Sequence, residues 1–160
     1  MKYFSYGSNM NSKRMEDREI NFSKRELAIL KDYELCFNKQ AFHNPNEGYA
    51  NLSPEKDKVT EGILYEIDDK DIVKLDKFEG YPNHYIKKAI KVELANSNEV
   101  DALVYLARPD KIKDGLKPTK EYLNHLMEGR DLISGNYNNF LQSFDTMEAL
   151  KQSDTNNKKG

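Results

Sequence analysis

The chain has 160 residues, and charged residues of both signs make up 32% of it, with a formal net charge of −2. This length suits one ordinary domain with its own core, and the balanced charge without a basic block argues against a nucleic-acid partner. No apolar run is long enough to span a membrane, and the single cysteine excludes an intrachain disulfide. We expect a cytoplasmic protein without a signal peptide, because the chain begins as a strand and has only this one thiol.

Strand patterns dominate the first two thirds of the chain. Apolar and aromatic residues alternate with polar ones, which is typical of half-buried strands. The predicted strands are residues 2–6, 26–38, 49–54, 59–67, 85–94 and 100–107. Several connections between them are too short for a crossover, so we expect about six strands with mostly antiparallel pairing.

Helical patterns are fewer, and they lie between and after the strands. The predicted helices are residues 11–18, 68–80, 119–132 and 137–144. The helix at 68–80 has an acidic start and ends at Gly80, a typical terminator. Together these elements predict one α+β domain over residues 1–145. The polar segment 146–160 is predicted to be a disordered tail.

The first strand stops at the sequence Tyr6-Gly7-Ser8-Asn9. One interpretation is a strand-to-helix connection, in which glycine allows a positive φ and a polar side chain caps the next helix. The other is an anion-binding loop, in which free backbone N–H groups hold a carboxylate or an oxyanion. The stretch by itself leaves both interpretations open.

Glu79 stands on the apolar side of the second predicted helix. At about 100° per residue, it falls between Ile72 and Leu75 on a helical wheel. Burial there disfavours the charged carboxylate, and so does the negative end of the helix dipole. Both effects raise a pKa, as a general acid/base working near neutral pH requires. The alternative is a surface glutamate on a fraying last turn, or one held by a lysine or arginine.

The other reactive side chains give weaker indications. Four of the ten tyrosines, Tyr6, Tyr81, Tyr85 and Tyr105, lie at strand ends or interiors near these segments. Each could equally be a half-buried aromatic with a local hydrogen bond. The three histidines lack the spacing of metal ligands, so no metal is predicted, and Cys36 alternates within a strand as a packing residue does.

Taken together, several motifs resemble one known family. The stretches "YFSYGSNM", "EGILYEI", "LDKFEGYPNHY" and "DALVYLA", in this order and spacing, are similar to those of the γ-glutamylcyclotransferase-like family. The resemblance runs from about residue 2 to about residue 144. It implies a small mixed, mostly antiparallel β-barrel with surrounding helices.

The resemblance also implies a site and a reaction. The loop Tyr6-Gly7-Ser8-Asn9-Met10 would bind the γ-glutamyl part of a small-molecule substrate. Glu79 would be the catalytic acid/base, and Tyr85 and Tyr105 would line the pocket. The reaction would cyclise a γ-glutamyl amide to 5-oxoproline and release the free amine. It needs no cofactor, metal or covalent nucleophile, since the amine attacks within its own molecule.

The leaving amine stays open, because relatives act on γ-glutamyl amino acids, γ-glutamylamines or a γ-glutamyl protecting group. Glutathione-specific relatives resemble a different motif, with leucine in place of Asn9 and a nearby tryptophan, and this chain has no tryptophan. The alternative function is a binding module that keeps the fold without this catalysis. We expect a monomer or a homodimer.

Overall fold

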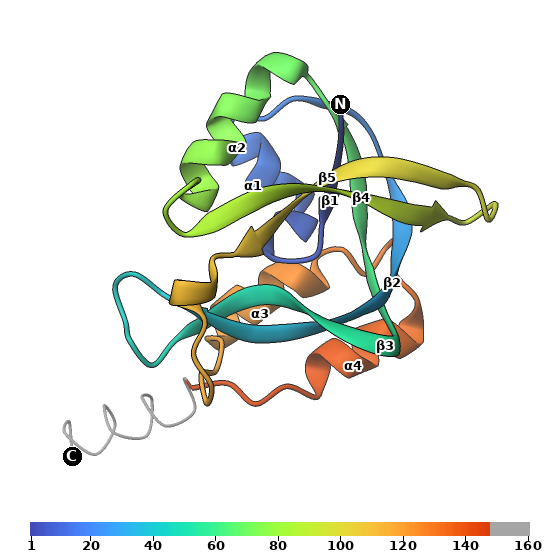
Figure 1. The fold of residues 1–160 in the computed structure, drawn as a ribbon. Helices are drawn as coiled ribbons and strands as arrows, with labels where there is room; N and C mark the ends of the chain where they lie inside the picture. Colours follow the sequence, from blue (N-terminus) through green and yellow to red (C-terminus); the bar gives the residue numbers. More distant parts are fainter. Residues whose placement is uncertain (148–160) are drawn as a thin grey trace.

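Five strands close into a barrel in the computed structural model, which describes residues 1–147 (Figure 1). Around the barrel the strands follow the order β1-β3-β2-β4-β5. Their bounds are Lys2–Ser5 (β1), Phe22–Gln40 (β2), Gly48–Ile67 (β3), Tyr85–Leu94 (β4) and Glu99–Ala107 (β5). The predicted fold class, a mostly antiparallel α+β barrel with surrounding helices, is confirmed.

The short strand β1 makes the barrel mixed. It pairs antiparallel with β3 and parallel with β5, where Tyr3 lies opposite Leu103. All other pairings are antiparallel. The C-terminal end of β1 therefore lies between β3 and β5, and the loop that follows it lies at the rim of the barrel.

Two of the predicted strands, 49–54 and 59–67, are parts of the single strand β3. Its pairing with β2 is irregular between them, because Tyr33 lies opposite Pro54 while Lys31 lies opposite Val59. Proline is tolerated there, since β1 pairs only with the far end of β3 and leaves this edge unpaired. The predicted count of about six strands thus becomes five.

Short helices surround the barrel. They are the 3₁₀ turns Ser8–Met10 (η1), Asp69–Asp71 (η2) and Pro109–Lys111 (η3), and the helices Ser12–Asp17 (α1), Ile72–Glu79 (α2), Lys120–Met127 (α3) and Gly135–Gln142 (α4). The predicted helix 119–132 ends early, at α3, and the chain passes through Gly129 before α4. Figure 1 shows α3 and α4 along the β2–β3 ribbon, and α1 and α2 at the other end of the barrel.

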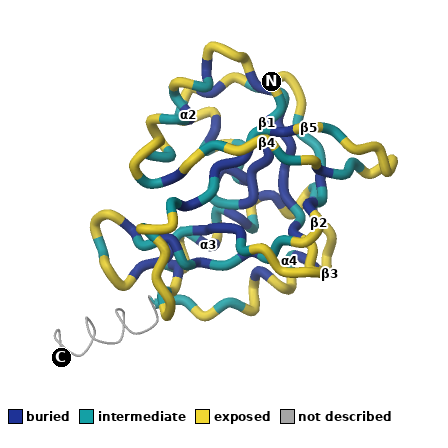
Figure 2. The backbone as a smooth tube through the Cα atoms, in the orientation of Figure 1, coloured by how far each residue is buried: buried dark blue, intermediate teal, exposed yellow. Residues whose placement is uncertain are grey.

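The core fills the barrel and continues under the helices. Its fully buried members come from all five strands and from the helices α1 to α4; among them are Phe4, Ile63, Val104, Leu75 and Leu126. Figure 2 shows buried backbone along the central strands, with exposed segments at the loop tips and on the outer side of α2. Helix α2 therefore turns its inner side toward the core, as the sequence predicts.

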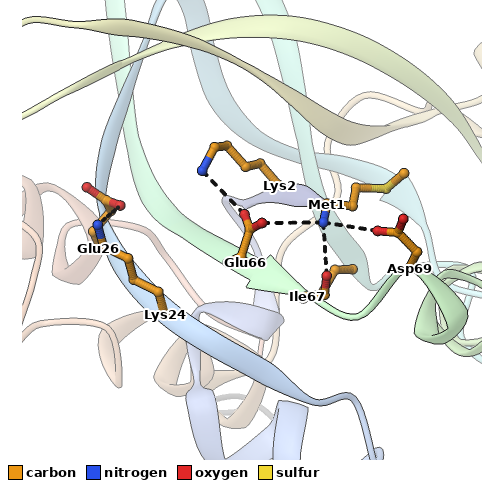
Figure 3. A network of polar contacts seen from close by, with 7 residues as sticks. All are labelled: Met1, Lys2, Lys24, Glu26, Glu66, Ile67 and Asp69. Carbon is orange, nitrogen blue, oxygen red and sulfur yellow. Dashed lines mark hydrogen bonds and ion pairs between the residues drawn. The ribbon is translucent and has the colours of Figure 1, made fainter.

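The N-terminal amino group fixes the start of β1. It donates to the carbonyl oxygen of Ile67 at 3.0 Å and forms ion pairs with Glu66 at 3.6 Å and Asp69 at 3.1 Å (Figure 3). Lys2 adds a further pair with Glu66 at 3.3 Å. These contacts hold β1 in register with β3, and so they help to place the loop at its other end.

Among residues 1–147, no helix is long and apolar enough to cross a membrane. Most of the predicted tail, residues 148–160, lies outside the described residues.

Candidate active site

A pocket opens where β1 ends, and most of the predicted site residues meet there. Its empty volume is about 330 Å³. The predicted residues that line it are Tyr6, Gly7, Ser8, Asn9, Glu79, Tyr85 and Tyr105, and they are joined by Tyr3, Phe4, Ser5, Ala50 and Tyr122. Segments up to 119 residues apart in the chain, from Tyr3 to Tyr122, therefore line one pocket.

Glu79 is the only carboxylate of this lining. It is the last residue of α2, which ends at Gly80 in the left-handed conformation, with φ 65°. Burial raises the pKa of the Glu79 carboxyl to about 7, against the opposing effect of Arg18, Arg14 and Lys39. A carboxyl with a pKa near 7 can both accept and return a proton at neutral pH.

Asn9 connects Glu79 to its surroundings. Its side-chain Nδ2 lies 3.5 Å from Glu79 Oε1 and donates to the Tyr3 hydroxyl at 3.1 Å. Its Oδ1 accepts from Arg18 at 3.0 Å, and its carbonyl oxygen accepts from the Tyr65 hydroxyl at 2.6 Å. With both polar atoms of its side chain and its carbonyl oxygen engaged, Asn9 is fixed in position, and it contacts both Glu79 and Arg18.

Gly7 adopts φ −115° and ψ −142°, so a positive φ is not what selects glycine here. The reason lies in the available space. A Cβ atom at this position would lie 3.2 Å from the Ala50 Cβ and 3.4 Å from the Tyr122 hydroxyl. Among the described residues, we find no hydrogen bond donated by the backbone N–H of Gly7, Ser8 or Asn9. These amides are available to an oxygen atom in the pocket.

The helix-capping role falls to Asn11, whose side chain accepts from the Lys13 N–H at 3.1 Å. Neither Ser8 nor Asn9 caps α1. The helix cap and the candidate anion-binding loop are thus made by different residues. Asn11 caps α1, and residues 7–9 line the pocket.

The pocket tyrosines are held by hydrogen bonds to backbone and side chains. The Tyr6 hydroxyl donates to the carbonyl oxygen of Tyr105, and the Tyr85 hydroxyl donates to that of Ala50 at 2.8 Å. The Tyr105 hydroxyl donates to Asp76 Oδ1 at 2.7 Å, and Lys87 pairs with the other oxygen of Asp76 at 3.0 Å. Burial raises the pKa of Tyr6 and Tyr85 well above the usual tyrosine value, so both are neutral.

Three other residues singled out in the sequence lie away from the pocket lining. Met10 is fully buried beside Gly129, so its place is in the core. Tyr81 is exposed under the ammonium group of Lys87. Cys36 donates to the carbonyl oxygen of Asn51 at 3.4 Å, and burial raises its pKa to about 11, which leaves a protonated thiol.

A second, wider hollow adjoins the pocket, and the sequence interpretation missed it. The two share Ser8, Glu79, Tyr85 and Tyr122. The second hollow has an empty volume of about 760 Å³, and its lining includes Arg14, Arg18, Lys39, Lys77 and His84. The spacing of Arg14 and Arg18, four residues apart, could have indicated a basic side of α1. No local sequence pattern indicated that Lys39 lies near them.

Metal binding has no support in residues 1–147, where no group of three or more His, Cys, Asp or Glu side chains is placed to hold an ion. The lining offers one carboxyl that can exchange a proton, free backbone amides and neutral hydroxyl groups. This combination suits acid/base chemistry on a small polar molecule with an oxyanion to stabilise.

Fold and pocket together define a small β-barrel protein with a carboxyl-containing pocket at its rim. Residues 3–124 match the model of the family described as "Gamma-glutamyl cyclotransferase, AIG2-like". The chain belongs to this family, which confirms the resemblance seen in the sequence.

Individual relatives are more distant. A Methanocaldococcus jannaschii protein named "Putative gamma-glutamylcyclotransferase" is 32% identical over 62 residues, which are 36% of this chain and 52% of the relative. This chain therefore matches about half the length of that curated relative.

Solved structures share the fold at low sequence identity. One described as "Gamma-glutamyl cyclotransferase" is 20% identical with a TM-score of 0.80, covering 91% of this chain and 88% of the other. YkqA from Bacillus subtilis is 23% identical with a TM-score of 0.78, covering 92% of this chain and 56% of its own. A yeast cyclotransferase described as specific to glutathione is 14% identical with a TM-score of 0.65, covering 88% and 93%.

Proposed function

We propose that this protein is an enzyme that cyclises γ-glutamyl amides to 5-oxoproline and releases the free amine. The observation that carries the proposal is the Glu79 carboxyl, whose pKa is about 7 and which stands at the junction of the two hollows. Membership of the γ-glutamyl cyclotransferase family supports it. A cytoplasmic location, a monomeric or homodimeric state, and the boundary between domain and tail stay predictions.

The reaction asks little of the protein beyond geometry and proton transfer. The α-amine and the γ-carbonyl belong to one substrate molecule, so holding it folded brings the reacting atoms together. The narrow pocket would hold the γ-glutamyl group, with Tyr6, Tyr85 and Tyr105 as its walls. Since their hydroxyl groups are engaged elsewhere, these walls are rigid, and they help to keep the substrate in one shape.

Glu79 would carry the protons. Its carboxylate takes one from the α-ammonium, and the freed amine attacks the γ-carbonyl carbon to form the ring C–N bond. The backbone amides of Gly7, Ser8 and Asn9 are the available donors to the oxyanion. The amide C–N bond then breaks as Glu79 delivers a proton to the leaving nitrogen. Glu79 then takes the second proton from the ring nitrogen and passes it to the released amine, so that two protons leave the attacking nitrogen and the amine departs as an ammonium ion.

Asn9 and Arg18 would also act on Glu79. Asn9 holds one carboxyl oxygen, and Arg18 holds Asn9. The charge of Arg18 also opposes the effect of burial, so the pKa of Glu79 stays close to neutrality instead of rising further.

The test is incubation of the purified protein with a panel of γ-glutamyl amino acids and γ-glutamylamines, with 5-oxoproline measured by mass spectrometry. The Glu79→Gln variant supplies the background. We expect 5-oxoproline from at least one compound with the parent chain only. Binding without product would favour the alternative, a binding module on this fold, and equal product from both proteins would show that Glu79 is not the acid/base.

A further inference from the structure

The second hollow carries several positive charges that lack a negative partner in the described chain. Arg14, Arg18 and Lys39 line it, and Glu79 is its only acidic residue. None of the three forms an ion pair among residues 1–147, whereas ten of the other nineteen lysine and arginine residues in this range do so. A group of cations around an open hollow favours an anionic occupant.

Lys39 is the most informative of the three. It is only 2% exposed, and its ammonium lies 2.8 Å from His84 Nδ1 and 5.6 Å from the rings of Tyr49 and Tyr85. Burial and the nearby Lys111 lower its pKa to about 8. A buried ammonium whose closest partner is a neutral ring costs free energy, and an anion in the hollow would offset that cost.

Arg14 adds an unused donor. Its Nε is buried and has no hydrogen-bond partner among the described residues, while Nη1 lies 3.3 Å from His125 Nε2. Burial and the charge of Arg14 lower the pKa of His125, so that histidine does not supply a compensating charge. A guanidinium with free donors is suited to a carboxylate.

The position of the hollow relates these cations to the reaction. Glu79 lies where the narrow pocket and the hollow meet, so the bond that breaks must lie there too. A substrate with its γ-glutamyl group in the narrow pocket extends its leaving amine into the hollow. That hollow is the larger of the two, which leaves room for leaving groups of different sizes.

We propose that Arg14, Arg18 and Lys39 bind a carboxylate on the leaving amine, so that the enzyme prefers γ-glutamyl amides of amines that carry an acid group. This inference rests on the proposed function and narrows its substrate class. It ranks γ-glutamyl amino acids above γ-glutamyl derivatives of simple alkylamines.

The test compares three γ-glutamyl amides that differ at one group: γ-glutamyl-alanine, γ-glutamyl-alaninamide and γ-glutamyl-ethylamide. We expect kcat/KM to be about tenfold or more higher for the alanine compound than for the other two, since a hydrogen bond to a charged group is worth that much. In Lys39→Met and in Arg14→Gln, the alanine-to-ethylamide ratio should fall by about tenfold. Lys91→Met, on the exposed side of β4, is the control and should leave the ratio as in the parent.

The outcomes separate the two proposals. Comparable kcat/KM for all three compounds overturns the carboxylate preference and leaves the proposed function standing. A ratio that stays the same in both variants, with both substrates affected equally, also overturns it, because the cations would then bind the γ-glutamyl end. No 5-oxoproline from any γ-glutamyl compound overturns the proposed function and this inference with it.

Discussion

The side-chain amide of Asn9 lies 3.5 Å from the carboxyl group of Glu79, although 70 residues separate them in the chain. One comes from the turn after β1 and the other from the last turn of α2. The barrel brings these two ends together, and the contact places the acidic group beside free backbone amides.

Glu79→Gln keeps the shape of the side chain and removes its ability to transfer protons. We expect kcat for γ-glutamyl substrates to fall by about 10²–10⁴-fold, the usual range for a lost general acid/base. The matched control is Glu128→Gln, since Glu128 is also at a helix C-terminus but is exposed. Steady-state kinetics on both variants is the measurement, and a Glu79→Gln rate within a few-fold of the parent would contradict the mechanism.

The raised pKa of Glu79 also predicts how stability depends on pH. Because the folded-state pKa of about 7 exceeds the ordinary 4.5, the folded protein binds a proton more tightly than the unfolded chain. Its contribution to stability is full below pH 4.5 and is lost as the pH rises through 7. Glu79→Gln removes this dependence.

We therefore expect the melting temperature of Glu79→Gln to rise relative to that of the parent as the pH increases from 4.5 to 8. Thermal unfolding of both proteins across this range is the measurement, with Glu128→Gln following the parent. Parallel curves for the parent and Glu79→Gln would mean that the Glu79 carboxyl titrates normally.

Tyr105→Phe tests the attachment of α2 to the barrel. The Tyr105 hydroxyl donates to Asp76, three residues before Glu79, so its loss should destabilise the protein by about 1.5 kcal/mol and lower activity modestly. Asp76→Asn should give a similar loss, and the double variant should cost less than the sum of the two. Denaturant unfolding measures the free energy of unfolding of the two single variants and the double variant, with Tyr33→Phe as the control. Additive losses would show that the hydrogen bond between Tyr105 and Asp76 does not stabilise the protein.

Gly7→Val tests the space at the end of β1. Its side chain would meet Ala50 and the Tyr122 hydroxyl inside the pocket, so we expect ligand binding and turnover to be lost while most of the fold is kept. Gly135→Val is the control, because a Cβ at Gly135 meets nothing within 4 Å. Circular dichroism and turnover are measured together. Normal turnover would mean that residues 6–9 are only a turn and do not bind the substrate.

Much of the fold could be predicted from the sequence because it depends on local periodicity. Alternating residues set the strands, and Gly80 set the end of α2. The same logic placed Glu79 on the apolar side of its helix, since the faces of a helix follow from spacing alone. The loop at Gly7 was equally visible, because a lone glycine after an apolar strand is a local feature.

Only the tertiary structure decided what each of these residues meets. It joined residues 49–54 and 59–67 into β3, buried Met10, and directed the Tyr105 hydroxyl to Asp76 instead of the pocket. It also brought Lys39 of β2 into the hollow lined by Arg14 and Arg18 of the α1 region. Periodicity fixes which way a side chain points within its own element, whereas these contacts depend on strand register and barrel closure, which pair residues far apart in the chain.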